Sequence, residues 1–330
     1  MILAGDIGGT NVRLILADMH GADLKIIARA DFKSCLYDDL LPIIKQFLHD
    51  EGGDKLLINA ACFAVAGPVQ GQQANITNLP WLLDSRELSQ HLGCPVRLIN
   101  DFQGAGYGLE VLQAKDVLVL QEGRHTDGGT RVLLGAGTGL GMATIVHTHA
   151  GYSVLPSEGG HTEFAPQDEL DLALYHYLYN KIGRVCNEHI LSGQGLIRLY
   201  EFYRDQPDTS ESDIVRQAMT QQDPAAVISD AALQATDPIS QQALEHFIKI
   251  YGAVAGNLAL ICLAKGGVYI GGGIAARIAS KMQGPGFMQA FHNKGAMQEL
   301  MHTIPVRLIT NTQVGLLGAA HYAKRVTSNE

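Results

Sequence analysis

The chain has 330 residues, of which 46% are hydrophobic and 17% charged, and its formal net charge at pH 7 is −9. This length suits two domains or one large domain with a substantial core. Because the chain is acidic and contains no block of Lys and Arg, we expect no nucleic-acid partner.

The five cysteines are widely separated and show no CxxC or other metal-ligand spacing; they are Cys35, Cys62, Cys94, Cys186 and Cys262. This pattern predicts reduced thiols in a cytoplasmic protein. The opening MILAGDIGGT reaches glycine and aspartate too early for a signal peptide. The apolar run 254–263 is too short and too interrupted to span a bilayer. We therefore expect a cytoplasmic protein without a membrane partner.

The first half of the chain alternates predicted strands and helices. Apolar runs predict strands at 2–4, 12–17, 56–65 and 96–99. The first two flank a glycine turn, which is typical of a β-hairpin, and the near-continuous run 56–65 predicts a central strand buried on both faces. Helical spacing predicts helices at 40–48 and 85–92, the latter capped by Asp84 or Ser85.

The second half opens with the same pattern of strand, glycine turn and strand over residues 132–146. The segments LAGDIGGTNVRLIL and LLGAGTGLGMATIV are loosely similar, which suggests two related halves. Further elements are predicted as helices at 168–181, 195–203, 239–264 and 315–323 and a strand at 267–270. The first of these helices is predicted to bury one face, formed by Leu170, Ala173, Leu174, Tyr177 and Leu178.

Three glycine-rich turns each end a predicted strand. They contain Gly5, Asp6, Ile7, Gly8, Gly9 and Thr10; Gly135, Gly137 and Thr138; and Gly271, Gly272 and Gly273. Each alone is typical of an ordinary turn, but three together favour phosphate or nucleotide binding through backbone N–H groups. Asp6 fits such a site if a Mg²⁺ ion with its waters lies between the carboxylate and the phosphates. No Gly-Lys dipeptide and no GxGxxG after the first strand occur, which excludes a Walker A loop and a Rossmann fingerprint.

A second group of residues is polar. Asn100 and Asp101 follow the predicted strand 96–99, where a carboxylate can hold a hydroxylated ligand and accept its proton; the alternative is that they start a turn or cap a helix. Glu158 and His161 are separated by two glycines, which permits a tight turn that aims both side chains at one point. Together with Glu188 they suit recognition of vicinal hydroxyls; the alternative is that they are solvated surface residues, as a single Glu or His in a loop most often is. The spacing matches no strong zinc pattern, so we expect no metal held by these residues.

These motifs resemble those of bacterial glucokinases, ATP-dependent hexokinase-like enzymes of the sugar kinase–Hsp70–actin superfamily. The matching segments occur in the family's order over nearly the whole chain: GDIGGTNVR, LINDFQGAGYG, LLGAGTGLG, SEGGH, NEHILSGQGL and YIGGGIA. The glycine motifs are shared across the superfamily, whereas NDF combined with SEGGH and a downstream glutamate is more specific. The zinc-binding CxCGxxGCxE motif of the related repressor/kinase branch is not matched.

The resemblance implies roles for individual residues. Asp101 becomes the catalytic base, and the implied glucose ligands are Asn100, Asp101, Glu158, His161 and Glu188. The turns at 5–10 and 135–138 become phosphate loops, and 271–273 the adenosine site. Asn78 is a further candidate for the sugar pocket, with a turn residue as the equal alternative.

The implied fold is α/β, a two-domain actin-like ATPase (ribonuclease H-like) fold with an interdomain cleft. We expect a small domain of residues 1–110 plus 312–330 and a large domain of 111–311. The expected reaction is phosphorylation of D-glucose to glucose 6-phosphate in glycolysis, with ATP and Mg²⁺, by a homodimer. The alternatives are a sugar-responsive regulator and an ATPase of the same superfamily without hexokinase activity.

Overall fold

A computed structural model describes residues 1–20, 23–53, 56–76, 78–207 and 209–328. The chain divides into two compact units. Unit 1 comprises Met1–Asp116, Thr148–Pro156 and Asn311–Glu330, and unit 2 comprises Val117–His147 and Ser157–Thr310. Each unit has its own sheet and its own apolar core, so each is described by itself below.

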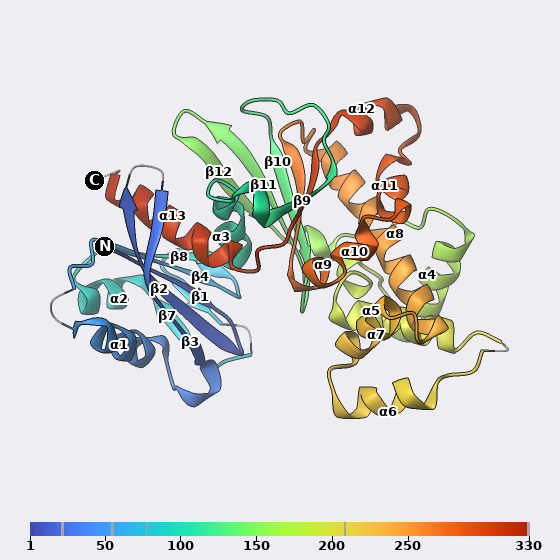
Figure 1. The fold of residues 1–330 in the computed structure, drawn as a ribbon, viewed down its shortest axis with the longest axis horizontal. Coiled ribbons are helices and arrows are strands. Elements are labelled where there is room, and N and C mark those ends of the chain that lie inside the picture. The colour runs from blue at the N-terminus through green and yellow to red at the C-terminus, as the bar shows by residue number, and fades with distance from the viewer. Residues whose placement is uncertain (21–22, 54–55, 77, 208, 329–330) are drawn as a thin grey trace. The chain divides into compact units, whose positions relative to one another are not determined.

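Unit 1 is built on a five-stranded sheet in the order β3-β2-β1-β4-β8 (Figure 1). The strands are β1 (Ile2–Ile7), β2 (Asn11–His20), β3 (Asp23–Lys33), β4 (Ala60–Val65) and β8 (Val96–Asn100). The first three strands are antiparallel, and β1, β4 and β8 run parallel to one another. The carboxyl ends of β1, β4 and β8 therefore meet at one edge of the sheet.

Helices cover this sheet. They are α1 (Leu40–Glu51), α2 (Ser85–Leu92), α3 (Asp101–Gly108) and α13 (Val314–Ser328), and three short strands β5 (Val69–Gln70), β6 (Gln73–Asn75) and β7 (Leu82–Asp84) form a separate small sheet. Helix α13 packs against β1, β4 and α3 (Figure 1). Asp84 caps α2 by accepting a hydrogen bond from the Arg86 N–H, which confirms one of the two predicted caps.

The glycines after Asp101 belong to α3 and serve helix packing. A Cβ on Gly104 would lie 2.8 Å from the Ala64 Cβ, and one on Gly108 would lie 2.2 Å from the Val314 carbonyl oxygen. A Cβ on Gly318 of α13 would in turn meet the Gly104 carbonyl oxygen at 1.8 Å. Glycines on both helices thus let α3 and α13 approach each other closely, and this positions the start of α3.

Unit 2 contains the strand order β11-β10-β13-β14-β9. These strands are β9 (Val117–Gln121), β10 (Arg131–Ala136), β11 (Leu140–Thr148), β13 (Gly267–Gly271) and β14 (Val306–Ile309), and β12 (Gly151–Ser157) crosses from unit 1 into unit 2. β10 and β11 form an antiparallel hairpin, while β10, β13 and β14 are parallel. The same arrangement, a hairpin followed by two parallel strands, occurs in β2-β1-β4-β8, as the similar segments suggest.

The longest helix of unit 2 is α8 (Pro238–Ile261). The others are α4 (Glu169–Ile182), α5 (Gly193–Arg204), α6 (Asp213–Gln221), α7 (Pro224–Leu233), α9 (Gly273–Arg277), α10 (Ala279–Met282), α11 (Pro285–His292) and α12 (Gln298–Thr303). Of these, α5, α7 and α11 pack against α8. Glycines on α8 permit a close approach of α11, because a Cβ on Gly252 would lie 2.0 Å from the Phe287 carbonyl oxygen. Within the described ranges, no helix is both long and apolar enough to cross a membrane.

Two predictions about local structure are wrong. The strand predicted at 56–65 begins only at Ala60, and Leu57 is 76% exposed. The buried face of α4 contains Asp171 with Leu174 and Leu178, whereas Leu170 is exposed. Asp171 tolerates burial because it is paired with His246 Nε2 and Lys249 Nζ, each at 2.8 Å.

Candidate active site

Asn100 and Asp101 lie at the carboxyl end of β8, beside the end of β4. Asn100 caps α3: its Oδ1 accepts from the Phe102 N–H at 2.9 Å, and its own N–H donates to Gln103 Oε1 at 3.1 Å. Its Nδ2 also donates to the Gly67 carbonyl in the turn after β4, at 3.3 Å. The helix-cap interpretation is therefore correct for Asn100, and the cap fixes Asp101 as the first residue of the helix.

Asp101 is half-buried, and its Oδ1 accepts a hydrogen bond from the Phe102 N–H at 2.9 Å. Burial raises the pKa of its carboxyl group to about 6; the hydrogen bond from Phe102 opposes this shift, and the negative charge of Asp6 adds to it. A carboxyl group with this pKa is ionised at neutral pH and still basic enough to accept a proton from a bound hydroxyl group.

The first glycine turn is shorter than predicted, because Gly5, Asp6 and Ile7 all lie in β1. A Cβ on Gly5 would lie 2.7 Å from the Phe63 ring, so this glycine serves core packing. Asp6 pairs with Arg13 across the hairpin, with Nη1 and Oδ2 3.0 Å apart. The turn itself comprises Gly8, Gly9 and Thr10 and closes through a hydrogen bond from the Gly8 N–H to the Asn11 carbonyl, at 2.9 Å.

In unit 2 the structure brings Glu158, His161 and Glu188 together. His161 Nε2 lies 4.0 Å from Glu158 Oε2, and His161 Nδ1 lies 3.9 Å from Glu188 Oε1. The two glycines are needed for this turn, because a Cβ on Gly160 would lie 2.1 Å from the Leu140 carbonyl oxygen and one on Gly159 would lie 2.8 Å from Met142 Sδ. The predicted convergence of Glu158 and His161 is thus confirmed. The Glu158 side chain is 90% exposed and that of Glu188 30% exposed.

Glu188 also makes a contact that the sequence did not reveal. Its Oε2 accepts a hydrogen bond from the Leu140 N–H at 2.8 Å and lies 2.5 Å from the position that a Cβ on Gly139 would occupy. The carboxylate therefore joins the polar group around His161 to the second glycine turn. Gly139 leaves the space that this carboxylate fills. Leu140 and Glu188 are 48 residues apart, and no local sequence pattern predicts a contact between them.

The second and third glycine turns lie against each other. The second is held by hydrogen bonds from the Gly137 N–H to the Gly139 carbonyl and from the Gly193 N–H to the Gly137 carbonyl, both at 2.8 Å. Gly272 has a φ of +86°, and a Cβ there would lie 2.4 Å from the Ala136 carbonyl oxygen. Only glycine fits this backbone conformation and this contact. Gly137, Thr138, Gly272 and Gly273 thus follow the ends of two adjacent strands, β10 and β13.

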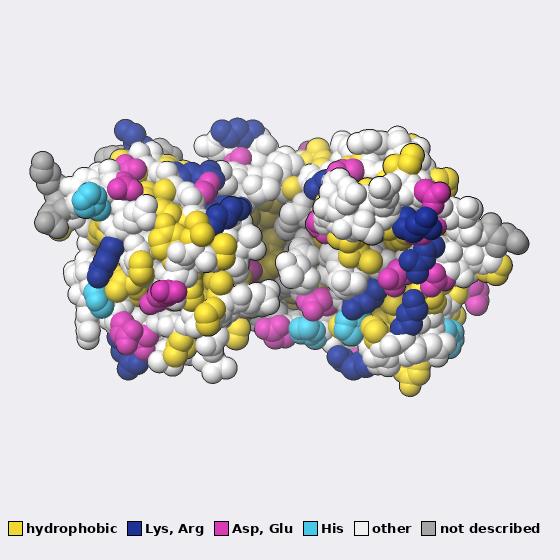
Figure 2. Space-filling model, turned by 90° about the horizontal axis from the view of Figure 1, so that it is seen from below, with side chains coloured by type: hydrophobic (Ala, Val, Ile, Leu, Met, Phe, Trp, Pro, Cys, Tyr) yellow, Lys and Arg dark blue, Asp and Glu magenta, His cyan; other side chains and the backbone are white. Residues whose placement is uncertain are grey.

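Within the described residues, no three His, Cys, Asp or Glu side chains are arranged to hold a metal ion. Asn78 has a φ of +65°, which is typical of a turn residue. On the face shown in Figure 2, Lys and Arg side chains lie among acidic and apolar ones rather than in one basic patch.

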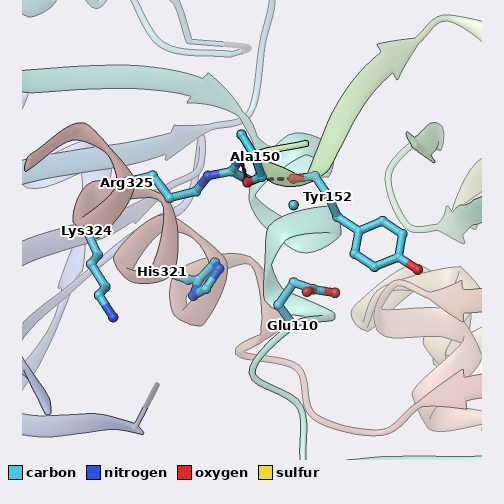
Figure 3. Close-up of a pocket in the computed structure, with 7 residues that line it drawn as sticks. Glu110, Ala150, Tyr152, His321, Lys324 and Arg325 are labelled. Atoms are coloured by element: carbon cyan, nitrogen blue, oxygen red, sulfur yellow. Dashed lines mark hydrogen bonds between the residues drawn. The ribbon is translucent and has the colours of Figure 1, made fainter. Parts of the chain in front are cut away.

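A cavity of about 280 Å³ in unit 1 is lined by Glu110, Tyr152, His321, Lys324 and Arg325, among others (Figure 3). Arg325 closes one side of it by donating to the carbonyls of Ala150 and Tyr152. None of the predicted site residues lines this cavity.

Comparisons with known proteins identify the family. The glucokinase family model matches residues 3–326. A glucokinase of Nostoc sp. is 43% identical, over 99% of each chain. The crystal structure of a glucokinase from an Antarctic psychrotroph superposes with a TM-score of 0.86 at 31% identity, covering 98% of each chain.

A more distant structure shows the fold alone. It is a ROK family glucokinase from Streptomyces griseus in complex with glucose and AMPPNP, with a TM-score of 0.62 at 19% identity over 98% of this chain and 99% of that one. The shared α/β architecture is that of the actin-like ATPases, as predicted. From the family model and the full-length relatives, the chain belongs to the glucokinase family and is a phosphotransferase enzyme of that family.

Proposed function

We propose that this enzyme transfers the γ-phosphoryl group of ATP to the 6-hydroxyl of D-glucose, with Asp101 as the general base. The proposal is supported by the glucokinase relatives and by the Streptomyces griseus enzyme, whose structure contains glucose and AMPPNP. The observation on which it depends most is the Asp101 carboxyl group, with its pKa raised to about 6 at the edge where β1, β4 and β8 end.

In this mechanism the Asp101 carboxylate accepts the proton of the sugar O6–H as O6 attacks the γ-phosphorus. The bond between the γ-phosphorus and the bridging oxygen breaks, and ADP leaves with both electrons of that bond. Asn100 positions Asp101, because it caps α3 and so fixes the first turn of the helix, in which Asp101 lies. We propose that Asn100, Glu158, His161 and Glu188 bind the sugar hydroxyls, with His161 as a sugar ligand rather than a zinc ligand.

The glycine turns supply backbone N–H groups for the phosphates, with Gly8–Thr10 and Gly137–Thr138 as phosphate loops and Gly271–Gly273 at the adenosine. Gly5 and Ile7 support the first loop as strand residues. Mg²⁺ brought with the nucleotide would neutralise charge on the transferred group, and Asp6 would hold it through its waters. Asp6 offers carboxylate oxygens, which suit this ion. Its charge also raises the pKa of Asp101, which supports a position near the proposed base.

The direct test is glucose-dependent release of ADP from ATP by the purified protein. We expect release to require both glucose and Mg²⁺, with ADP and polyphosphate tested as alternative donors in parallel. ATP hydrolysis that is independent of glucose would favour an ATPase, and glucose binding without ADP release would favour a sugar-responsive regulator. We also propose, from the family resemblance, a cytoplasmic homodimer that acts in glycolysis; sedimentation velocity tests the dimer.

A further inference from the structure

Tyr251 is a polar residue in the centre of unit 2 that the proposed mechanism does not use. It lies in α8 and has no exposed surface. Its ring is held by edge-to-face contacts with Phe247 and Phe287, with centroid distances of 5.8 and 6.1 Å. Because these contacts and its complete burial hold the ring, the position of its hydroxyl group is defined.

That hydroxyl group connects the ends of two strands. It accepts a hydrogen bond from the Ala136 N–H at 3.0 Å, at the end of β10. It lies 3.3 Å from the carbonyl oxygen of Gly271, the last residue of β13, and 3.5 Å from that of Leu134. A hydroxyl group has one proton to donate, and the shorter distance favours the Gly271 carbonyl.

The backbone geometry explains why a side chain is needed there. The parallel register between β10 and β13 ends at the pair Gly135 and Gly271. The chain then turns away at Gly272, where φ is +86°, and enters α9. The Ala136 N–H therefore lies beyond the last paired residue of β13, and Tyr251 supplies its acceptor. A buried N–H group requires such a partner.

Both strand ends lead directly into turns of the proposed nucleotide site. Ala136 precedes Gly137 and Thr138, and Gly271 precedes Gly272 and Gly273. The two turns also touch, since a Cβ on Gly272 would lie 2.4 Å from the Ala136 carbonyl oxygen. This contact and the Tyr251 hydroxyl group thus both join one turn to the other.

We propose that Tyr251 is a positioning residue for ATP: its buried hydroxyl group ties the phosphate turn after β10 to the adenosine turn after β13. This inference rests on the proposed function, because it takes these two turns as the nucleotide site. The Tyr251 hydroxyl group lies outside every glycine motif. It would set the spacing between the turn that binds the phosphates and the turn that binds the adenosine.

The test is Tyr251→Phe, which removes the hydroxyl group and keeps the ring that Phe247 and Phe287 hold. We expect the KM for ATP and the Kd for AMPPNP to rise about tenfold, since small displacements of positioning groups have effects of this order or larger. The Kd for glucose, measured by calorimetry without nucleotide, should rise clearly less than the Kd for AMPPNP, because Glu188 is the one proposed sugar ligand that contacts the turn after β10.

Tyr200→Phe is the matched control. Tyr200 is also buried, at 1% exposure, in helix α5 of the same unit. Its hydroxyl group donates to Glu211 Oε1 at 3.3 Å, so the substitution also removes a hydrogen-bonded hydroxyl group from a buried tyrosine. If Tyr251 acts only on stability, both variants lower Tm and neither changes the KM for ATP. That outcome would overturn the inference.

Failure of the proposed function is seen as a lack of activity in the wild-type protein, whereas this inference is tested by comparing Tyr251→Phe with an active wild-type protein. A wild-type protein that binds no ATP would overturn both. If Tyr251→Phe does not fold, hydrogen exchange of the wild-type protein tests whether the two turns respond to nucleotide together. AMPPNP should then slow exchange in residues 134–138 and 270–274 with one common midpoint concentration, and protection of one segment alone would overturn the inference.

Discussion

The chemistry proposed for this enzyme depends most on one carboxyl group. Asp101→Asn should lower kcat by roughly 10²–10⁴, the usual contribution of a positioned base. The Kd for glucose should stay within a few-fold of wild type, because an amide can still bind a hydroxyl group and can still accept from the Phe102 N–H. A coupled assay for ADP and calorimetry with glucose measure the two quantities.

Asp39→Asn is the control for this substitution. Asp39 is also a carboxylate at a helix start, where it accepts a hydrogen bond from the Leu40 N–H and caps α1. An asparagine can retain this cap, so kcat should not change. A variant Asp101→Asn with near-normal kcat would remove Asp101 from the proposed mechanism.

The pH dependence of the reaction follows from the raised pKa of Asp101. The base must be ionised in the free enzyme, so kcat/KM should fall as the pH is lowered through about 6, the pKa of this carboxyl group. The residual activity of Asp101→Asn should lack this acidic limb. If wild type and variant show the same limb, another group controls it and the assignment of the base is wrong.

The same shift predicts an effect on folding stability. The pKa of Asp101 is raised from 3.8 to about 6 on folding, so its contribution to stability is present below pH 3.8 and is lost as the pH rises through 6. At pH 7.5, Asp101→Asn should therefore raise the free energy of unfolding by on the order of 1 kcal/mol, after allowance for the partial exposure of the group.

This difference in the free energy of unfolding should shrink as the pH falls from 7.5 towards 4, because the protonated Asp101 carboxyl group of the wild type is then neutral, like the amide of the variant. Urea unfolding of both proteins at several pH values measures it. A variant that is less stable than wild type at pH 7.5 would show that Asp101 is not held in an unfavourable environment. Loss of activity together with gain of stability is the expected signature of a functional carboxylate.

At the scale of elements, the turn between β12 and the segment before α4 determines where Glu158 and His161 lie. Gly160→Ala should weaken glucose binding tenfold or more, because its Cβ would lie 2.1 Å from the Leu140 carbonyl oxygen and the turn would have to move. Gly286→Ala is the control, since a Cβ there would meet no atom within 4 Å, and it should bind glucose normally. Normal glucose affinity in Gly160→Ala would contradict the sugar-ligand assignment of this turn.

At the scale of the whole molecule, the proposed glucose ligands come from both units. Asn100 and Asp101 belong to unit 1, and Glu158, His161 and Glu188 belong to unit 2. We expect saturating glucose to slow hydrogen exchange in residues 100–103 and in 158–161 with the same midpoint concentration. Sorbitol at equal concentration is the control. Protection confined to one unit would show that the other set does not bind the sugar.

Features determined by neighbouring residues could be predicted from the sequence. The two glycine-centred hairpins and the Asp84 cap depend on turn chemistry, capping and periodicity. The convergence of Glu158 and His161 was likewise predictable, because two glycines between them fix the turn locally. The motif order was sufficient to indicate the family.

Other features were decided by the tertiary structure alone. Asp171 is buried in place of Leu170 because His246 and Lys249, on another helix, pair with its charge. Glu188 binds the Leu140 N–H, and the Tyr251 hydroxyl group binds the Ala136 N–H. Such contacts join residues far apart in the chain, and their energy comes from satisfying buried polar groups after the elements have packed. Periodicity and spacing carry no record of them, so the sequence determined which elements form, while packing determined which side chains support the candidate site.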